Sequence, residues 1–317
     1  MRVFHGLKTL VPPLRETAVA IGVFDGVHRG HQEILRQTAR EALSQGLTPV
    51  ALTFDIHPSE LFAPQHTPSY IASLAQRAAL IARDGGVETV VFVRFDTEFA
   101  ALTPKEFVAD VLKAKLDARH VLVGADFCYG KGRAGTVTTL LQSGARDNFA
   151  VTVVPPILMD DARISSTRIR GLVADGDLPA ALRLLGHPFV VEGTVVTGKQ
   201  LGRTLGFPTA NLQPTQARQL LPGNGVYAAY ANLDDGRIIR AAVSVGTNPT
   251  TDTDGGRKIE AYLLDNFAED LYGQPLALDF RLKVRDEERF DSLPALVAQM
   301  GRDVQTVTQL VPISPER

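Results

Sequence analysis

The sequence predicts an N-terminal α/β domain with a doubly wound parallel sheet, joined to a small C-terminal β-barrel domain. Three observations lead to this expectation. The chain has 317 residues, which is more than one core usually holds, since single cores stop growing near about 250–300 residues. In the first part, short β-branched runs alternate with helical stretches, which is typical of a parallel sheet. After residue 186, strand-like runs follow one another directly, as in a small closed barrel.

Near-continuous apolar runs are the strands expected in the first domain. They cover residues 18–24, 48–54, 87–93, 119–124 and 149–155. Such runs are typical of strands that are buried on both faces of a sheet. Amphipathic segments over 32–46 and 104–118 predict helices between them. The second helix has Thr103 as its expected N-cap and Pro104 at its first helical position.

The strands expected in the barrel are shorter and separated by turns rich in Gly, Asn and Asp. They cover residues 189–196, 225–233, 237–246, 257–264 and 276–284, and one helix follows near 292–303. Residues 195–212 are interpreted as a long loop between strands. Helical patterning ends at Gly186, and Pro188 blocks its continuation. The predicted domains are therefore 1–186 and 187–317.

Composition excludes several classes of partner. A formal net charge of -2 gives no electrostatic case for a nucleic-acid or membrane surface. No apolar run approaches the ~18–20 residues of a membrane span, and the N-terminal segment does not have the pattern of a signal peptide. The single cysteine, Cys128, cannot form an internal disulfide, so a reducing, cytoplasmic setting is expected. We expect small-molecule substrates, no nucleic-acid or membrane partner, and a monomer or weak homo-oligomer.

The segment GVFDGVHRGH, residues 22–31, follows the first apolar run and leads into a helix. In open parallel sheets, ligands bind beyond the carboxyl ends of the strands. The three glycines permit tight turns and close backbone approach, and the helix start directs N–H groups toward an anion. His28 and His31 add further donors, so the segment predicts a phosphate-binding loop. A histidine metal pair and a purely structural turn are the alternatives that these residues leave open.

A second segment, RISSTRIRGLVADGD at 163–177, opens a helix with three hydroxyl residues and places Arg168 and Arg170 in its first turns. Arginines near a helix start oppose the helix dipole, so an anionic ligand would explain their position. Hydroxyl groups that only cap the helix are the alternative. The string GKGRAG, residues 130–135, does not follow the first strand, so we do not expect a dinucleotide-binding fingerprint there.

The first half resembles the nucleotidyltransferase superfamily, in which paired histidines contact ATP phosphates. The helix at 163–177 looks like the Ser-Ser-Thr-x-Ile-Arg signature of that superfamily, and VGADFCYGKGRAG is similar to a flavin-handling loop of FAD synthetases. The resemblance implies an ATP site for adenylyl transfer formed by Gly22, Phe24, Asp25, Gly26, His28, His31, Ser165, Ser166, Thr167 and Arg170, in which Arg170 contacts the β- and γ-phosphates. It also implies FMN contacts from His57, Asp126 and Phe127.

In the second half, residues 195–212 bring hydroxyl, amide and basic groups together without forming a Walker A loop. These groups suit phosphate and Mg²⁺, although a ligand-free barrel loop is an equal alternative. The string closely resembles the signature of riboflavin kinases, and four further motifs of that family follow in order. The resemblance implies ATP contacts from Gly198, Lys199, Gly202, Thr209 and Asn211, Mg²⁺ held by Thr209 and Asn211, Glu260 as general base, and flavin contacts from Arg285 and Glu287.

Glu260 also makes chemical sense without the family, because an alcohol such as the riboflavin 5′-hydroxyl needs a base to take its proton. A glutamate that merely faces outward on an alternating strand is the competing interpretation. The sequence departs from the family pattern at Ile56, Asn248 and Tyr262, which affects the expected flavin contacts, including that of His57.

Together the resemblances imply a bifunctional enzyme. It would phosphorylate riboflavin with ATP to give FMN, and then adenylylate FMN with a second ATP to give FAD and pyrophosphate, with Mg²⁺ as cofactor. Two alternatives remain open on the sequence. The first domain could act on another phosphorylated acceptor, with the barrel as a noncatalytic appendage, or the barrel could be a binding module for RNA or protein.

Overall fold

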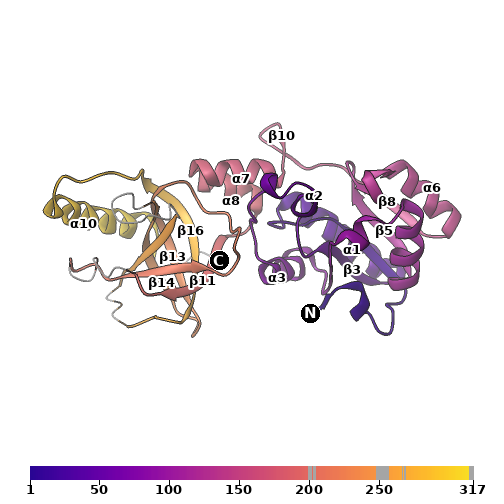
Figure 1. Cartoon of the computed structure of the whole chain (residues 1–317), viewed down its shortest axis with the longest axis horizontal. Coiled ribbons are helices and arrows are strands. Elements are labelled where there is room, and N and C mark those ends of the chain that lie inside the picture. The colour runs from indigo at the N-terminus through magenta and orange to yellow at the C-terminus, as the bar shows by residue number, and fades with distance from the viewer. Residues whose placement is uncertain (199–201, 203–204, 248–256, 266, 268, 314–317) are drawn as a thin grey trace. The chain divides into compact units, whose positions relative to one another are not determined.

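A computed structural model describes residues 1–198, 202, 205–247, 257–265, 267 and 269–313 (Figure 1). These residues form two compact units. The first comprises Met1–Pro68 and Leu74–Ser165, and the second comprises Ser69–Ser73 and Ser166–Arg317. No helix in this part of the chain is long and apolar enough to cross a membrane.

The first unit is built on a six-stranded parallel sheet with the order β1-β4-β3-β2-β5-β8. Its strands are β1 (Arg2–His5), β2 (Thr17–Ile21), β3 (Thr48–Phe54), β4 (Thr89–Val93), β5 (Ala118–Gly124) and β8 (Ala150–Val154). The chain proceeds from β2 to β3 on one side and later places β5 on the other side. The strand order therefore reverses beside β2, and such a switch point opens a ligand crevice at the carboxyl ends of the strands.

Helices cover both faces of this sheet, as the sequence predicts. The main helices are α1 (Arg29–Gln45), α2 (Pro58–Phe62), α3 (Leu74–Gly85), α4 (Thr97–Ala100), α5 (Pro104–Glu106), η3 (Phe107–Lys115) and α6 (Val137–Asp147). Val19 and Ile21 of β2 belong to the core that contains η3 residues and Leu140 of α6. Ala20, between them, packs in the core of α1 and α3. Side chains alternate across a strand, so burial of both sets shows a doubly wound sheet.

Short elements complete the first unit. They are η1 (Leu7–Thr9), η2 (Pro64–His66), β6 (Cys128–Tyr129), η4 (Lys131–Arg133), β7 (Gly135–Thr136), β9 (Leu158–Met159) and β10 (Ala162–Arg163). Two features differ from the prediction. β1 was not predicted, and most of the helix expected over 104–118 is π-helical, with Leu116 N–H donating to Val111 carbonyl at 3.1 Å. The predicted cap is present, because Thr103 forms a capping box with Glu106.

The second unit contains a closed antiparallel barrel with the order β11-β12-β15-β14-β13-β16. Its strands are β11 (Phe189–Val196), β12 (Thr209–Pro214), β13 (Gly225–Leu233), β14 (Ile238–Gly246), β15 (Lys258–Leu263) and β16 (Pro275–Arg285). Helix α10 (Leu293–Leu310) lies against β13, β14 and β16 (Figure 1). It extends beyond the predicted end at 303 because Val307 and Val311 pack into the cluster on the barrel surface.

Strand β12 overlaps the segment 195–212 that was interpreted as a long loop, and this interpretation was wrong for residues 209–212. Within β12 only Leu212 is buried, so the segment lacks the apolar alternation that identifies a strand from sequence. Two helices that precede the barrel, α7 (Ser166–Asp175) and α8 (Leu178–Leu185), belong to the second unit. Helix α8 ends at its C-cap Gly186, which adopts the left-handed conformation.

Candidate functional site

The loop between β2 and α1 has an unusual backbone. Phe24, Gly26 and Val27 have φ angles of 50°, 74° and 35°. Left-handed conformations are uncommon for residues other than glycine, and they concentrate at functional sites. Phe24 and Val27 are fully buried. A side chain at Gly22 would lie 2.8 Å from the Phe24 ring, so glycine is required there for packing.

His28 is the N-cap of α1, and its Nδ1 accepts the backbone N–H of His31 at 3.3 Å. An accepting Nδ1 places the proton of the neutral imidazole on Nε2, which is then a donor. The two imidazole rings stack with centroids 3.6 Å apart and planes 16° apart. A side chain at Gly30 would lie 3.2 Å from the His28 ring. The structure therefore brings His28 and His31 together at the positive end of a helix, an arrangement that suits a phosphate group.

The loop after β3 carries His57 at a neighbouring strand end. His57 caps α2, with Nδ1 accepting the Ser59 N–H at 3.2 Å. Asp55 fixes this loop, because its Oδ1 accepts the N–H groups of Ile56 at 2.8 Å and of Phe95 at 2.9 Å. His57 thus has a defined orientation at the edge where ligands of parallel sheets bind.

Asp126 and Phe127 follow β5, on the other side of β2. Arg163 of β10 forms an ion pair with Asp126 at 3.0 Å, and its hydrogen bond holds the pKa of that carboxyl below its ordinary value. Phe127 stacks on Tyr129 with ring centroids 5.6 Å apart and planes 12° apart. The structure gives Asp126 an arginine partner that the sequence did not reveal.

A chain of aromatic rings runs from the loop after β3 to the loop after β5. Its successive members are Phe62, Phe95, Phe54, Phe99, Phe107, Tyr129 and Phe127, with centroid separations of 5.3 to 6.2 Å. Phe62, at one end, is 68% exposed. Sequence reasoning found only Phe127, because the other rings are scattered over several elements and share no motif.

The Ser-Ser-Thr-x-Ile-Arg segment begins α7, and Arg170 Nε donates to the Ser69 carbonyl at 2.7 Å. Both of these residues belong to the second unit, whereas the histidine loop belongs to the first. That Ser165, Ser166, Thr167 and Arg170 act together with the histidines stays a prediction.

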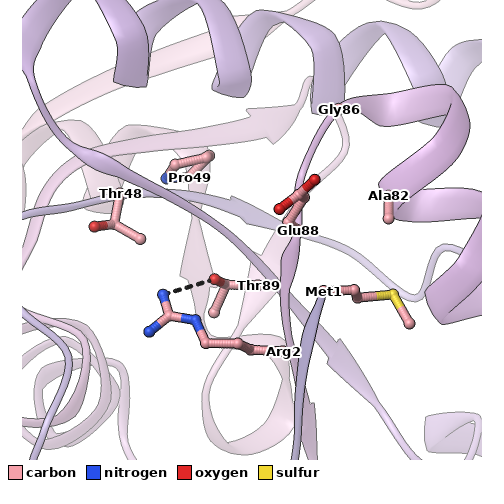
Figure 2. Close-up of a pocket in the computed structure, with 8 residues that line it drawn as sticks. All are labelled: Met1, Arg2, Thr48, Pro49, Ala82, Gly86, Glu88 and Thr89. Atoms are coloured by element: carbon pink, nitrogen blue, oxygen red, sulfur yellow. Dashed lines mark hydrogen bonds between the residues drawn. The ribbon is translucent and has the colours of Figure 1, made fainter.

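A cavity of about 380 Å³ opens at the amino ends of β1, β3 and β4. Figure 2 shows its lining residues, among which Arg2 donates to the Thr89 hydroxyl at 3.0 Å. The residues expected to bind nucleotide follow the carboxyl ends of the strands, at the opposite edge of the sheet. This cavity is therefore separate from the predicted nucleotide site.

In the barrel, strand register aligns the residues predicted for phosphoryl transfer. Asn211 of β12 pairs directly with Glu260 of β15, and Thr209 pairs with Tyr262. Directly paired residues of antiparallel strands have their side chains on the same face. Ile259 and Ala261, the neighbours of Glu260, are buried, whereas Glu260 itself is half-buried. The alternation places Glu260, Asn211 and Thr209 together on the outer face of the barrel.

Two glycines of the preceding segment approach these side chains closely. A methyl group at Gly198 would lie 2.5 Å from Asn211 Cγ and 2.7 Å from Asn211 Oδ1. A methyl group at Gly202 would lie against the Phe207 carbonyl and 3.4 Å from Thr209 Oγ1. Gly198 and Gly202 are thus required for close approach. Lys199 and Asn248 lie outside the described residues.

Arg285 and Glu287 are held by other protein groups. Arg285 forms an ion pair with Asp303 of α10 at 2.8 Å. Glu287 accepts a hydrogen bond from Asn224 at 2.9 Å, and it packs so closely on Gly246 that a methyl group there would lie 2.8 Å from its Cδ. Both residues have structural partners, and their flavin contacts stay predictions.

Comparison with known proteins assigns each part of the chain. A family model described as FAD synthetase matches residues 11–168, and one described as riboflavin kinase matches residues 185–311. The bifunctional riboflavin kinase/FMN adenylyltransferase of Escherichia coli K12 is 39% identical over 310 residues, which is 98% of this chain and 97% of that protein. The chain belongs to the bifunctional riboflavin kinase/FMN adenylyltransferase family. It therefore produces FMN from riboflavin and FAD from FMN, and it uses ATP.

Two other matches also span nearly the whole chain. The bifunctional riboflavin kinase/FMN adenylyltransferase of Pseudomonas fluorescens is 37% identical and covers 100% of both chains. A solved structure, described as a macrolide-efflux protein from Streptococcus pneumoniae, has 33% identity and a TM-score of 0.87, and covers 98% of this chain and 100% of that chain. Each of the two family models matches one part of the chain, and the predicted fold class is confirmed. The predicted domain bounds stay a prediction.

Proposed function

We propose that each activity has its own site, the adenylyltransferase at the β2–α1 loop of the first unit and the kinase on the outer face of the barrel. The observation that carries the kinase assignment is the register of β12 and β15, which pairs Asn211 with Glu260. The observation that carries the adenylyltransferase assignment is the His28–His31 stack at the start of α1.

Thr209 and Asn211 are the residues that would hold Mg²⁺ in the kinase site. A hydroxyl and an amide offer the oxygen ligands that Mg²⁺ prefers, with ATP phosphates as the remaining ligands. Gly198 and Gly202 let the backbone approach these two side chains more closely than a residue with a Cβ atom could. When bound, Mg²⁺ neutralises charge on the phosphate that is transferred. The close approach of Gly198 to the Asn211 side chain supports this assignment.

Glu260 would accept the proton of the riboflavin 5′-hydroxyl. Such a general base contributes roughly 10²–10⁴-fold to the rate. Arg285 would contact the flavin further along the barrel surface. Successive direct pairs place Glu260 beside Ser244, Ser244 beside Val226, and Val226 beside Arg285. The separation is three strand spacings, about 14 Å around the barrel, a span that suits an elongated flavin. Glu287 is proposed as the second residue that contacts the flavin.

The adenylyltransferase needs no base, because the FMN phosphate is already ionised. His28, His31 and the N–H groups at the start of α1 would hold the ATP phosphates, with Arg170 and the hydroxyls of α7 as additional ligands. Fixed orientation can lower such a barrier by about 7–11 kcal/mol. The ring chain between Phe62 and Phe127 offers apolar faces for the flavin, with His57 and Asp126 at its edges.

Single-site variants test the division of labour. Glu260→Gln is expected to lower FMN formation by roughly 10²-fold or more and to leave conversion of FMN to FAD unchanged. His31→Ala is expected to do the reverse. Both half-reactions are measured by separating riboflavin, FMN and FAD by chromatography. Equal loss of both activities in either variant would overturn the proposal.

We further propose that the enzyme acts in the cytoplasm as a monomer or weak homo-oligomer.

A further inference from the structure

The β2–α1 loop requires support from outside itself. The left-handed conformations of Phe24 and Val27 are strained, and such conformations persist only where the surroundings over-determine them. Some support is local, because Gln32 Nε2 donates to the Val27 carbonyl at 2.9 Å. The Val27 N–H also donates to the Phe24 carbonyl at 3.1 Å. The Val23 carbonyl, near the start of the loop, accepts hydrogen bonds from two other elements.

Arg77 of α3 provides one of these bonds. Its Nη1 donates to the Val23 carbonyl at 3.2 Å and to the Phe54 carbonyl at 2.8 Å. Thr53 Oγ1 donates to the same Val23 carbonyl at 2.8 Å. The Arg77 guanidinium also lies 6.0 Å from the centre of the Phe92 ring.

Arg77 is only 1% exposed, which is rare for an arginine. Burying a charged side chain is costly unless its donors are satisfied. An apolar side chain would fill the space between α3 and the sheet without this cost. Because burying the charge is costly, we infer that the guanidinium is present for its hydrogen bonds to the Val23 and Phe54 carbonyls. Val23 opens the loop that carries His28 and His31, and Phe54 is the last residue before the loop that carries His57.

We propose that Arg77 is a positioning residue for adenylyl transfer, which fixes the ATP-binding loop relative to the FMN-binding loop. This inference rests on the function proposed above for those loops. One nitrogen atom joins both loops, so its two bonds set their separation. Each loop would still bind its own substrate without Arg77, but the attacking phosphate would no longer meet ATP in line. A misplacement of about 1 Å can lower a rate by about 10²-fold.

The test compares three full-length variants. Arg77→Met removes both bonds while filling similar space. Arg77→Lys keeps the charge and can restore one bond. Arg83→Met is the matched control on the same helix, because the Arg83 side chain is 59% exposed and pairs only with neighbouring Asp84 among the described contacts. For each variant, kcat and KM are measured for FMN adenylylation and for riboflavin phosphorylation, and folding is followed by circular dichroism.

We expect Arg77→Met to lower kcat for adenylylation by about 10²-fold, with KM for ATP and FMN changed less than about threefold and kinase activity unchanged. Arg77→Lys is expected to recover about tenfold, and Arg83→Met to match the wild type. Adenylylation within twofold of wild type in a folded Arg77→Met overturns the inference, as does equal loss of both activities. If Arg77→Met does not fold, Arg77→Lys decides: an unchanged kcat overturns the inference, and a tenfold loss supports it.

His31→Ala, assayed alongside, separates this inference from the function on which it rests. If His31→Ala abolishes adenylylation and Arg77→Met does not affect it, only the role of Arg77 is wrong. If His31→Ala leaves adenylylation intact, the proposed site itself is wrong.

Discussion

Replacing Gly198 by alanine is expected to impair the kinase alone. The added methyl group would lie 2.5 Å from Asn211 Cγ, whereas carbon atoms in contact are ordinarily about 3.5–4.0 Å apart. Either the Asn211 amide or the backbone at 198 must therefore move by about 1 Å or more. Because a shift of this size in a positioned group can reduce a rate by about 10²-fold, we expect kcat for FMN formation to fall by that factor.

The assay follows FMN formation from riboflavin and ATP by chromatography, with conversion of FMN to FAD measured in the same preparation. Adenylyl transfer should be unchanged, because Gly198 belongs to the second unit. Gly301→Ala is the matched control, since a methyl group there has no atom within 4 Å. Kinase activity within threefold of wild type in Gly198→Ala would refute the close-approach role of this glycine.

Two further predictions concern the stability of the barrel, which is measured by urea unfolding. Tyrosine fluorescence reports mainly on the barrel unit, because five of the six tyrosines belong to the second unit. Burial raises the pKa of Asp279 to about 6, so the stability that this carboxyl contributes is complete below about pH 4 and is lost as the pH rises through 6. The free energy of unfolding of Asp279→Asn, relative to wild type, should therefore increase by up to about 3 kcal/mol between pH 4 and pH 7. A difference between the two proteins that does not change with pH would contradict this. Asp303→Ala leaves the Arg285 guanidinium, whose side chain is 17% exposed, without its carboxylate partner. The free energy of unfolding should fall by about 3–5 kcal/mol. A decrease below 1 kcal/mol would show that the ion pair does not anchor α10.

The sequence predicted most of the architecture because burial leaves a pattern. The apolar run that contains Val19 and Ala20 indicated a strand buried on both faces, and the structure places these residues in different cores. Polar strands leave no such pattern, which is why β12 was interpreted as a loop. The helix near 292–303 was predicted too short, and the structure continues it to Leu310, where packing of Val307 in the cluster stabilises the added turns.

Site residues were predictable where a local motif carries them, and not where the tertiary structure recruits them. His28 and His31 are three residues apart, and the structure stacks their rings. Arg77 lies within an ordinary amphipathic helix, where arginine indicates a solvent-exposed position, yet it is fully buried. Likewise, nothing near Arg285 in the sequence indicates its partner Asp303. Pairings across long sequence separations depend on the packing of whole elements.

Complementation between two inactive variants tests the central claim of two independent sites most directly. Glu260→Gln and His31→Ala are incubated with riboflavin, ATP and MgCl₂, separately and together, and FAD is measured by chromatography. Alone, the first should accumulate little FMN, and the second should stop at FMN. The mixture should form FAD, because FMN released by one variant is used by the other. A mixture that forms no more FAD than the two separate reactions combined would contradict the claim.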